Sequence, residues 1–222
     1  MVNLSSLHWF VVESSIQEFE RYHDLIEQFL NEEKQRLEDS FNKMESELKK
    51  NKDDDDYYNH MIDVYSEKFG EISTLFPHNF RSSFLIQIIS FVEFHLKKIC
   101  DNSARTQKQP FVMSDLKGNS DFEKAKVYLK KVADLDISKL GEDWEFIDGC
   151  RIIRNKLVHQ QGLMGKNDDN KKSIEKFAKK QGLITVAEKT NDCESRIEIN
   201  DKELNAKLIS SVSGFFKELL GK

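Results

Sequence analysis

The stretch "NFRSSFLIQIISFVEFHLKKICD", residues 79–101, is the most apolar part of the chain. Its large apolar residues recur at steps of three and four, which is the period of one face of an α-helix. These residues are Phe80, Phe84, Leu85, Ile88, Ile89, Val92, Leu96 and Ile99. Phe91 and Phe94 widen the stripe until little polar face remains. The pattern predicts a helix that is either central in the fold or buried between the core and a subunit interface.

On the N-terminal side of this helix, the sequence becomes a charged rod with a single apolar stripe. A helix capped by Ser14 or Ser15 is expected to reach about residue 50, because apolar residues keep returning at steps of three, four and seven. A second helix is expected over roughly 55–70, ending at a glycine. We therefore predict an N-terminal helical arm, residues 1–74, whose stripe packs on the rest of the domain or on a partner chain.

On the C-terminal side, more amphipathic helices are expected at about 121–133, 142–162, 171–180 and 201–220. Before the last of them, "LITVAEK" and "SRIEIN" flank "TNDCE". Their β-branched residues and alternating pattern predict a β-hairpin. The predicted fold class is mostly α, a helical bundle over 75–222 with a long N-terminal arm and a small β-hairpin before the C-terminal helix.

The charge of the chain is unevenly distributed. The net charge is −5, which is not the overall balance of a nucleic-acid-binding protein. Residues 13–56 hold fifteen acidic and seven basic residues, whereas residues 97–131 hold nine basic and four acidic ones. A local basic surface in the middle of the chain is therefore expected despite the acidic total.

Several classes of protein are disfavoured by what the sequence contains. Cys100, Cys150 and Cys193 are far apart and odd in number, which indicates reduced thiols rather than a disulfide framework. Residues 1–10 lack the pattern of a secretory signal, and no stretch approaches the length of a membrane span, so a cytoplasmic protein is expected. The histidines have no metal-ligand spacing and no phosphate-binding glycine loop occurs, so neither a metal nor another cofactor is expected.

The helix expected at 142–162 ends in "RIIRNKLVHQQG", residues 151–162. On a helical wheel Arg151, Asn155 and His159 point away from the predicted core face, and Arg154 lies on the border. The core face consists of Phe146, Cys150, Ile153 and Leu157. One interpretation is structural: His159 is a cation favoured by the helix dipole in the last turn, and the arginines are flank residues. The other is an active site.

"RNKLVH" resembles the signature of the HEPN superfamily, in which an arginine is followed after four to six residues by a histidine. The resemblance covers roughly 75–220, and Asn155 matches the polar residue that usually follows the arginine. Many members also carry a glutamate and a basic residue four positions apart on an earlier core helix, which Glu93 and Lys97 match here. The resemblance implies a metal-independent ribonuclease that dimerises so that two motif helices face each other; many members have lost catalysis.

The residue types also suit RNA cleavage when they are considered without the family resemblance. RNA carries its own nucleophile, the 2′-OH, so that cleavage needs proton transfer and charge stabilisation. Histidine is the side chain used most often for general acid–base catalysis, so His159 can act as base or acid, and Arg154 offers a planar set of donors to phosphate oxygens. Asn155 can orient the histidine or bind phosphate or ribose, and Arg151 adds positive potential. Glu93 either holds an arginine or the histidine, or forms an ordinary i, i+4 ion pair with Lys97.

From these observations we expect an endoribonuclease that cleaves RNA as a homodimer. By analogy with such proteins, it would be a bacterial toxin or antiviral defence effector with RNA as its partner and a possible antitoxin or regulatory protein. The alternative is a non-catalytic HEPN-like module that binds RNA, a nucleotide or a protein partner. The edge formed by Phe91 and Phe94 is a candidate dimer interface.

Overall fold

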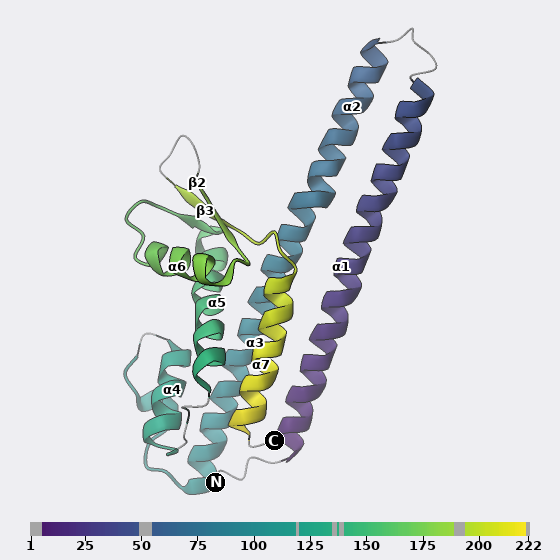
Figure 1. The fold of residues 1–222 in the computed structure, drawn as a ribbon. Helices are drawn as coiled ribbons and strands as arrows, with labels where there is room; N and C mark the ends of the chain where they lie inside the picture. The colour runs from purple at the N-terminus through teal and green to yellow at the C-terminus, as the bar shows by residue number, and fades with distance from the viewer. Residues whose placement is uncertain are drawn as a thin grey trace.

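The structure, a computed structural model, describes residues 6–48, 55–118, 120–134, 137, 140–188 and 194–220. Its elements are α1 (Ser6–Leu48), α2 (Asp55–Gly70), the π-helical η1 (Glu71–Leu75), α3 (Phe76–Gln107), the 3₁₀ turn η2 (Met113–Asp115), α4 (Asp121–Lys131), α5 (Gly141–Gln160), β1 (Leu163–Met164), α6 (Lys171–Gln181), β2 (Thr185–Glu188), β3 (Ser195–Glu198) and α7 (Glu203–Leu219) (Figure 1). Within these ranges the protein is mostly helical with a small three-stranded antiparallel sheet, in agreement with the predicted class.

The segments α2, η1 and α3 follow one another without a break and form one long rod beside α1 (Figure 1). The sequence predicts a helix end near Gly70 and a new helix after Pro77, and this break is absent. Gly70 keeps a right-handed helical backbone. Pro77 has no amide hydrogen, and its ring would clash with the carbonyl of residue 73 in a regular α-helix. The wider π-helical turn directly before it is the kind of local adjustment that lets a helix continue through such a position.

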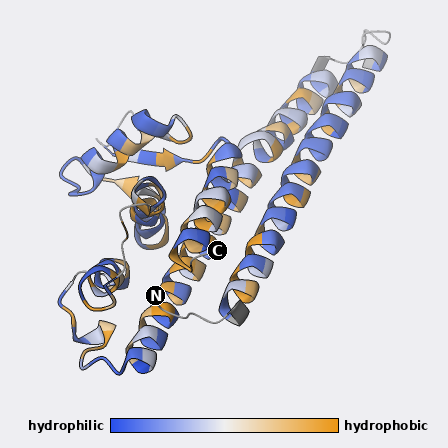
Figure 2. Cartoon of the chain, turned by 60° about the horizontal axis from the view of Figure 1, so that its bottom comes forward, coloured by the Kyte–Doolittle hydropathy of each residue, from blue (hydrophilic) through white to orange (hydrophobic). Residues whose placement is uncertain are grey.

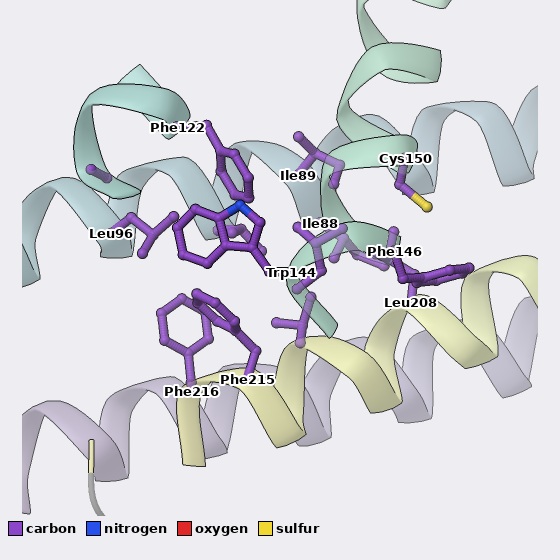
Figure 3. Packing of buried hydrophobic residues seen from close by; sticks show 14 of the residues in the cluster. Ile88, Ile89, Leu96, Phe122, Trp144, Phe146, Cys150, Leu208, Phe215 and Phe216 are labelled. Carbon is purple, nitrogen blue, oxygen red and sulfur yellow. The ribbon is translucent and has the colours of Figure 1, made fainter. Parts of the chain in front are cut away.

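The core lies where α3, α5 and α7 meet, as the close-up in Figure 3 shows. The predicted stripe of α3 is buried except for Phe80, which is partly buried, and Leu85, Ile88 and Val92 have no exposed surface. Trp144 of α5 packs against Phe122 of α4 and Phe215 of α7, with ring centroids 4.6 and 5.3 Å apart. Of the two positions expected for this helix, the structure shows the central one, since α3 contacts α1, α4, α5 and α7.

The first half of α1 belongs to this core. Val12 and Ile16 are buried in the core, because α1 packs along both α3 and α7. The predicted boundary between residues 74 and 75 falls inside the continuous rod, and α1 begins at Ser6, before the predicted caps. The part that projects from the bundle is smaller than the predicted arm; it consists of residues 31–48 and 55–70, which we call the outer arm (Figure 1).

The sheet confirms the predicted hairpin. β2 and β3 pair antiparallel, with Val186 opposite Ile197, and β1 adds a short third strand on the other side of β3. Ile197 is fully buried, whereas Arg196 beside it is exposed, which is the alternation expected of a half-buried strand. The turn of the hairpin, residues 189–193, lies outside the described residues. β1 was not predicted, since two residues carry too little pattern.

Cys100 and Cys150 are buried free thiols, and Cys193 lies outside the described residues. Burial raises the pKa of the Cys100 thiol to about 12 and also raises the pKa of Cys150. Both side chains therefore behave as small apolar groups in the core.

The outer arm and the basic segment 97–131 lie at opposite ends of the molecule, whereas the acidic residues in the first half of α1 lie along the bundle (Figure 1). The outer arm forms one end, and the C-terminal part of α3 and α4, which carry the basic residues of 97–131, form the other (Figure 1). Figure 2 shows α1 as mostly hydrophilic, with hydrophobic residues recurring along it. In the described part of the chain, no helix combines the length and the apolar character needed to cross a membrane.

Candidate functional site

The motif helix α5 has well-defined ends. Glu142 and Asp143 lie in its first turn, where the helix dipole favours acidic residues. At its C-terminal end, Gln161 and Gly162 both have positive φ, and both backbone amides donate to the carbonyl oxygen of Lys156. A Cβ on Gly162 would lie 3.4 Å from the carbonyl oxygen of Ile197, so glycine also allows β3 to approach. The last turn of the motif helix is thereby fixed against the sheet.

Arg154 of α5 and Glu93 of α3 form an ion pair between the two helices. The Arg154 side chain is 16% exposed and that of Glu93 is 27% exposed, so the pair is mostly removed from water. The Nε atom of Arg154 is buried and has no hydrogen-bond acceptor among the described residues. Lys97 is exposed, and no Glu93–Lys97 ion pair is found in the described part of the chain. Of the two interpretations of Glu93, the structure therefore has the one in which it holds an arginine.

Arg151 lies differently from the prediction. The helical wheel directs it away from the core, but it is buried, with 8% of its surface exposed. Its Nε donates to Asp148 at 2.8 Å, and its guanidinium lies 5.7 Å from the ring centroid of Phe122. The reason is that α4 covers this side of α5, where a planar guanidinium can stack on an aromatic ring. Arg151 thus packs α5 on α4, and its charge is paired.

Asn155 and His159 lie on the more open side of α5. Asn155 is partly buried and His159 is exposed in the last turn. Neither side chain makes a hydrogen bond or an ion pair with another residue in the described ranges. The fold therefore brings Arg154 and Glu93 together, whereas Asn155 and His159 project from α5 without a partner among the residues that the structure describes.

Sequence reasoning missed a second ion pair at this end of α5. Lys156 donates to Asp168 at 2.5 Å and to Gln160 at 3.2 Å, and the Lys156 and Asp168 side chains are only 12% and 7% exposed. Burial alone would raise the pKa of Asp168, but the hydrogen bonds from Lys156 and the Asn170 amide, with the charge of Lys156, bring it below its usual value. Because the partners are joined through a loop, no helical periodicity could have predicted this pair.

His95, two positions after Glu93, points to another side of α3. His95 is buried, and its Nδ1 is 3.1 Å from Nε2 of His8. Desolvation, followed by the neighbouring His8 and Lys98, lowers the pKa of His95 to about 4. His95 is therefore neutral near pH 7 and packs among aromatic rings, unlike the exposed His159.

Comparisons with known proteins add no relative to this picture. A scan against protein-family models finds no match, and searches of curated proteins and of solved structures find no significant match either. Within the described residues, no group of three or more His, Cys, Asp or Glu side chains is arranged to hold a metal ion. The geometry of α3 and α5 is therefore the basis for inferring a function.

Proposed function

We propose that the protein is a metal-independent endoribonuclease of HEPN type that acts as a homodimer. The observation that carries this proposal is the Glu93–Arg154 ion pair between α3 and α5. Arg154 lies five residues before the exposed His159 on α5. Two motifs that are sixty positions apart in the sequence meet at this pair, which a chance resemblance would not require. Lys97 and Asn155 flank the pair on α3 and α5.

In the proposed reaction the 2′-oxygen of a ribose attacks the adjacent phosphorus, and the bond from phosphorus to the 5′-oxygen breaks. A base takes the proton of the 2′-OH and an acid gives a proton to the leaving 5′-oxygen, leaving a 2′,3′-cyclic phosphate and a 5′-OH. His159 is the side chain suited to proton transfer near neutral pH. Because each chain offers one such histidine, the second proton transfer is assigned to His159 of a second copy.

Arg154 is proposed to stabilise the negative charge that grows on the phosphate oxygens. Glu93 is proposed to orient the guanidinium, since one of its oxygens engages Nη2 and leaves Nη1 for a ligand. Asn155 lies one position further along α5 and is proposed to contact phosphate or ribose. Arg151 is proposed to stabilise α5 and not to contact the reacting phosphate, because its guanidinium is paired with Asp148.

A second candidate function is a non-catalytic HEPN-like module that binds RNA, a nucleotide or a protein. One observation favours it: within the described residues, no side chain orients the His159 ring. Catalytic histidines are usually held by a second group that fixes the tautomer and ring orientation. A role as toxin or defence effector, with an antitoxin or regulatory protein as partner, is proposed from the family resemblance alone.

The test is an RNA-cleavage assay on purified protein in the presence of EDTA, beside the variants His159→Ala and Arg154→Ala. Each variant should lose about 100-fold or more in rate while circular dichroism shows an unchanged helix content. His60→Ala, which removes an exposed histidine of α2, is the matched control and should cleave normally. Product ends should be 2′,3′-cyclic phosphates.

Three outcomes would count against the nuclease. One is a loss of cleavage in EDTA, and another is 3′-OH products, since both indicate a metal-dependent mechanism. The third is equal cleavage by all variants, which indicates a contaminating enzyme. If no cleavage occurs but RNA binds and Arg154→Ala weakens that binding, the non-catalytic alternative is favoured.

A further inference from the structure

Among the side chains described in the outer arm, none is buried. Leu30 is the last buried residue of α1, and Pro77 is the next buried residue along the described chain. Between them the apolar side chains of both arm helices are only partly covered. A pair of helices that buries so little apolar surface gains little stability from packing, because most helical stability in proteins comes from a buried apolar face. The arm is therefore a surface that a further element can complete.

A groove runs between the two helices of the outer arm. It has a volume of about 520 Å³ and its apolar walls are Leu37 and Phe41 of α1 and Tyr65 and Phe69 of α2. Each pair is spaced i, i+4, so the two helices present parallel ridges. The ring centroids of Phe41 and Tyr65 are 5.3 Å apart, so these two rings pack against each other between the helices. Phe69 remains 39% exposed at one end.

The shape of this groove suits a third helix. Two ridges of apolar side chains at i, i+4 spacing offer the holes into which residues of another helix insert, as in helical bundles. An amphipathic helix with its apolar face in a groove is a common mode of peptide recognition. An extended strand would instead require a free sheet edge, which the outer arm does not offer.

The charge of the outer arm indicates which kind of third helix would bind in the groove. Residues 31–48 and 55–70 contain ten acidic and four basic residues. Glu38 lines the groove, and its carboxylate is 3.9 Å from Lys34 on the same helix. Pairing two such arms from two copies of the chain would bring like charges together, which is unfavourable, whereas a basic helix would be attracted. We propose that the outer arm is a docking site for a basic amphipathic helix of another protein.

This inference is independent of the proposed nuclease activity and is tested on the full chain by peptide binding and hydrogen exchange. The probe is a synthetic peptide of about three heptads, with leucine at the a and d positions and lysine or arginine elsewhere. Its two controls are a scrambled peptide of the same composition and a peptide with glutamate in place of the basic residues. The basic amphipathic peptide should slow amide exchange in 31–48 and 55–70, and its affinity should fall with added salt.

Variants locate the binding site. Phe41→Glu should abolish binding of the basic peptide, and Phe111→Glu, which changes an exposed aromatic residue outside the arm, should leave it unchanged. Glu38→Lys alters only a charge that lines the groove and leaves the apolar walls intact, so it should weaken binding about fivefold without unfolding the arm.

The proposal is overturned if the scrambled peptide binds as well as the amphipathic one, if protection appears outside the arm, or if no peptide binds. It is also overturned if the free protein already self-associates through the arm, with dimerisation lost in Phe41→Glu, because the occupant is then a second copy.

Discussion

At the scale of single residues, the Glu93–Arg154 pair determines how the candidate site is read. Because both side chains are largely removed from water, loss of either partner leaves a charge that is poorly solvated. A double-mutant cycle with Glu93→Gln and Arg154→Gln, measured by urea unfolding, should give a coupling of about 1–2 kcal/mol. The matched cycle with Glu93→Gln and Lys97→Gln should give less than about 0.5 kcal/mol. A larger coupling to Lys97 would contradict the observed pairing.

The Lys156–Asp168 pair leads to a prediction about pH. The pKa of Asp168 is below its usual value in the folded protein, so the pair contributes stability that is complete above the unfolded pKa of about 4. This contribution is lost as the pH falls through the lowered folded pKa. Asp168→Asn should therefore cost about 3 kcal/mol at pH 7, since it leaves Lys156 buried without a counter-charge. The difference from the unchanged protein should shrink below about pH 4.

The control for this prediction is another ion pair at the surface. Lys180 and Glu145 are 64% and 74% exposed, and Glu145→Gln should change the free energy of unfolding by less than about 0.5 kcal/mol. If Asp168→Asn and Glu145→Gln have equal effects at pH 7, burial of the Lys156–Asp168 pair has no energetic consequence.

The residues of α5 show what helical periodicity can predict and what it cannot. The wheel correctly buries Phe146, Cys150 and Ile153, because hydrophobic periodicity reports the face toward the core. It could not predict that Arg151 is buried, since α4 covers a second side of α5 and the wheel contains no information about neighbours. Likewise it left the partner of Glu93 open, because a contact between α3 and α5 is tertiary.

At the scale of elements, glycine determines how closely α5 and α6 approach. A Cβ on Gly149 would lie 2.3 Å from the ring of Phe177, so Gly149→Ala would push α6 away from α5. We expect a cost of about 1–3 kcal/mol in thermal or urea unfolding, as for other overpacked contacts. Gly70→Ala is the matched control, because nothing lies within 4 Å of a Cβ at that helical position. It should stabilise the protein by about 0.5–1 kcal/mol.

If Gly149→Ala is as stable as the unchanged protein, the helices are less tightly packed than the structure indicates. Combining it with Phe177→Ala should recover part of the loss from Gly149→Ala, since the added methyl group then occupies the space that the ring leaves. A double variant whose losses simply add would argue against a steric cause.

Element existence followed from the sequence more reliably than element boundaries. The helices at α4, α5, α6 and α7 and the hairpin all appear close to the predicted positions, because strong periodicity and β-branched alternation mark them. The predicted break between Gly70 and Pro77 does not occur, since a π-helical turn accommodates the proline without ending the helix. No local signal in the sequence distinguishes such a turn from a helix end.

At the scale of the whole molecule, α1 and α3 both expose large apolar residues. Tyr22, Leu25 and Phe29 of α1 and Phe76 and Phe94 of α3 are 45–63% exposed. Tyr22 lies beside α3, with its ring 5.9 Å from that of Phe80, so residues of both helices join in one surface. Exposed apolar patches of this kind mark interaction sites. Phe94 of the expected dimer edge is 53% exposed, whereas Phe91 packs inward against Phe19 and Phe216.

We expect a symmetric dimer through these exposed residues, because Phe94 lies next to the Glu93–Arg154 pair of the candidate site. Phe94 follows Glu93 directly on α3, so a two-fold axis near Phe94 would bring both copies of the Glu93–Arg154 pair toward one interface. We expect the unchanged protein to be a dimer by light scattering at high micromolar concentration. The double change Leu25→Glu with Phe94→Glu should give monomers, because it puts charge among these exposed apolar residues, and Phe111→Glu should not. If the proposed reaction needs two copies of His159, the monomeric variant should lose RNA cleavage with its fold intact. A monomeric unchanged protein, or a monomeric variant that cleaves at the full rate, would exclude a site shared between two copies.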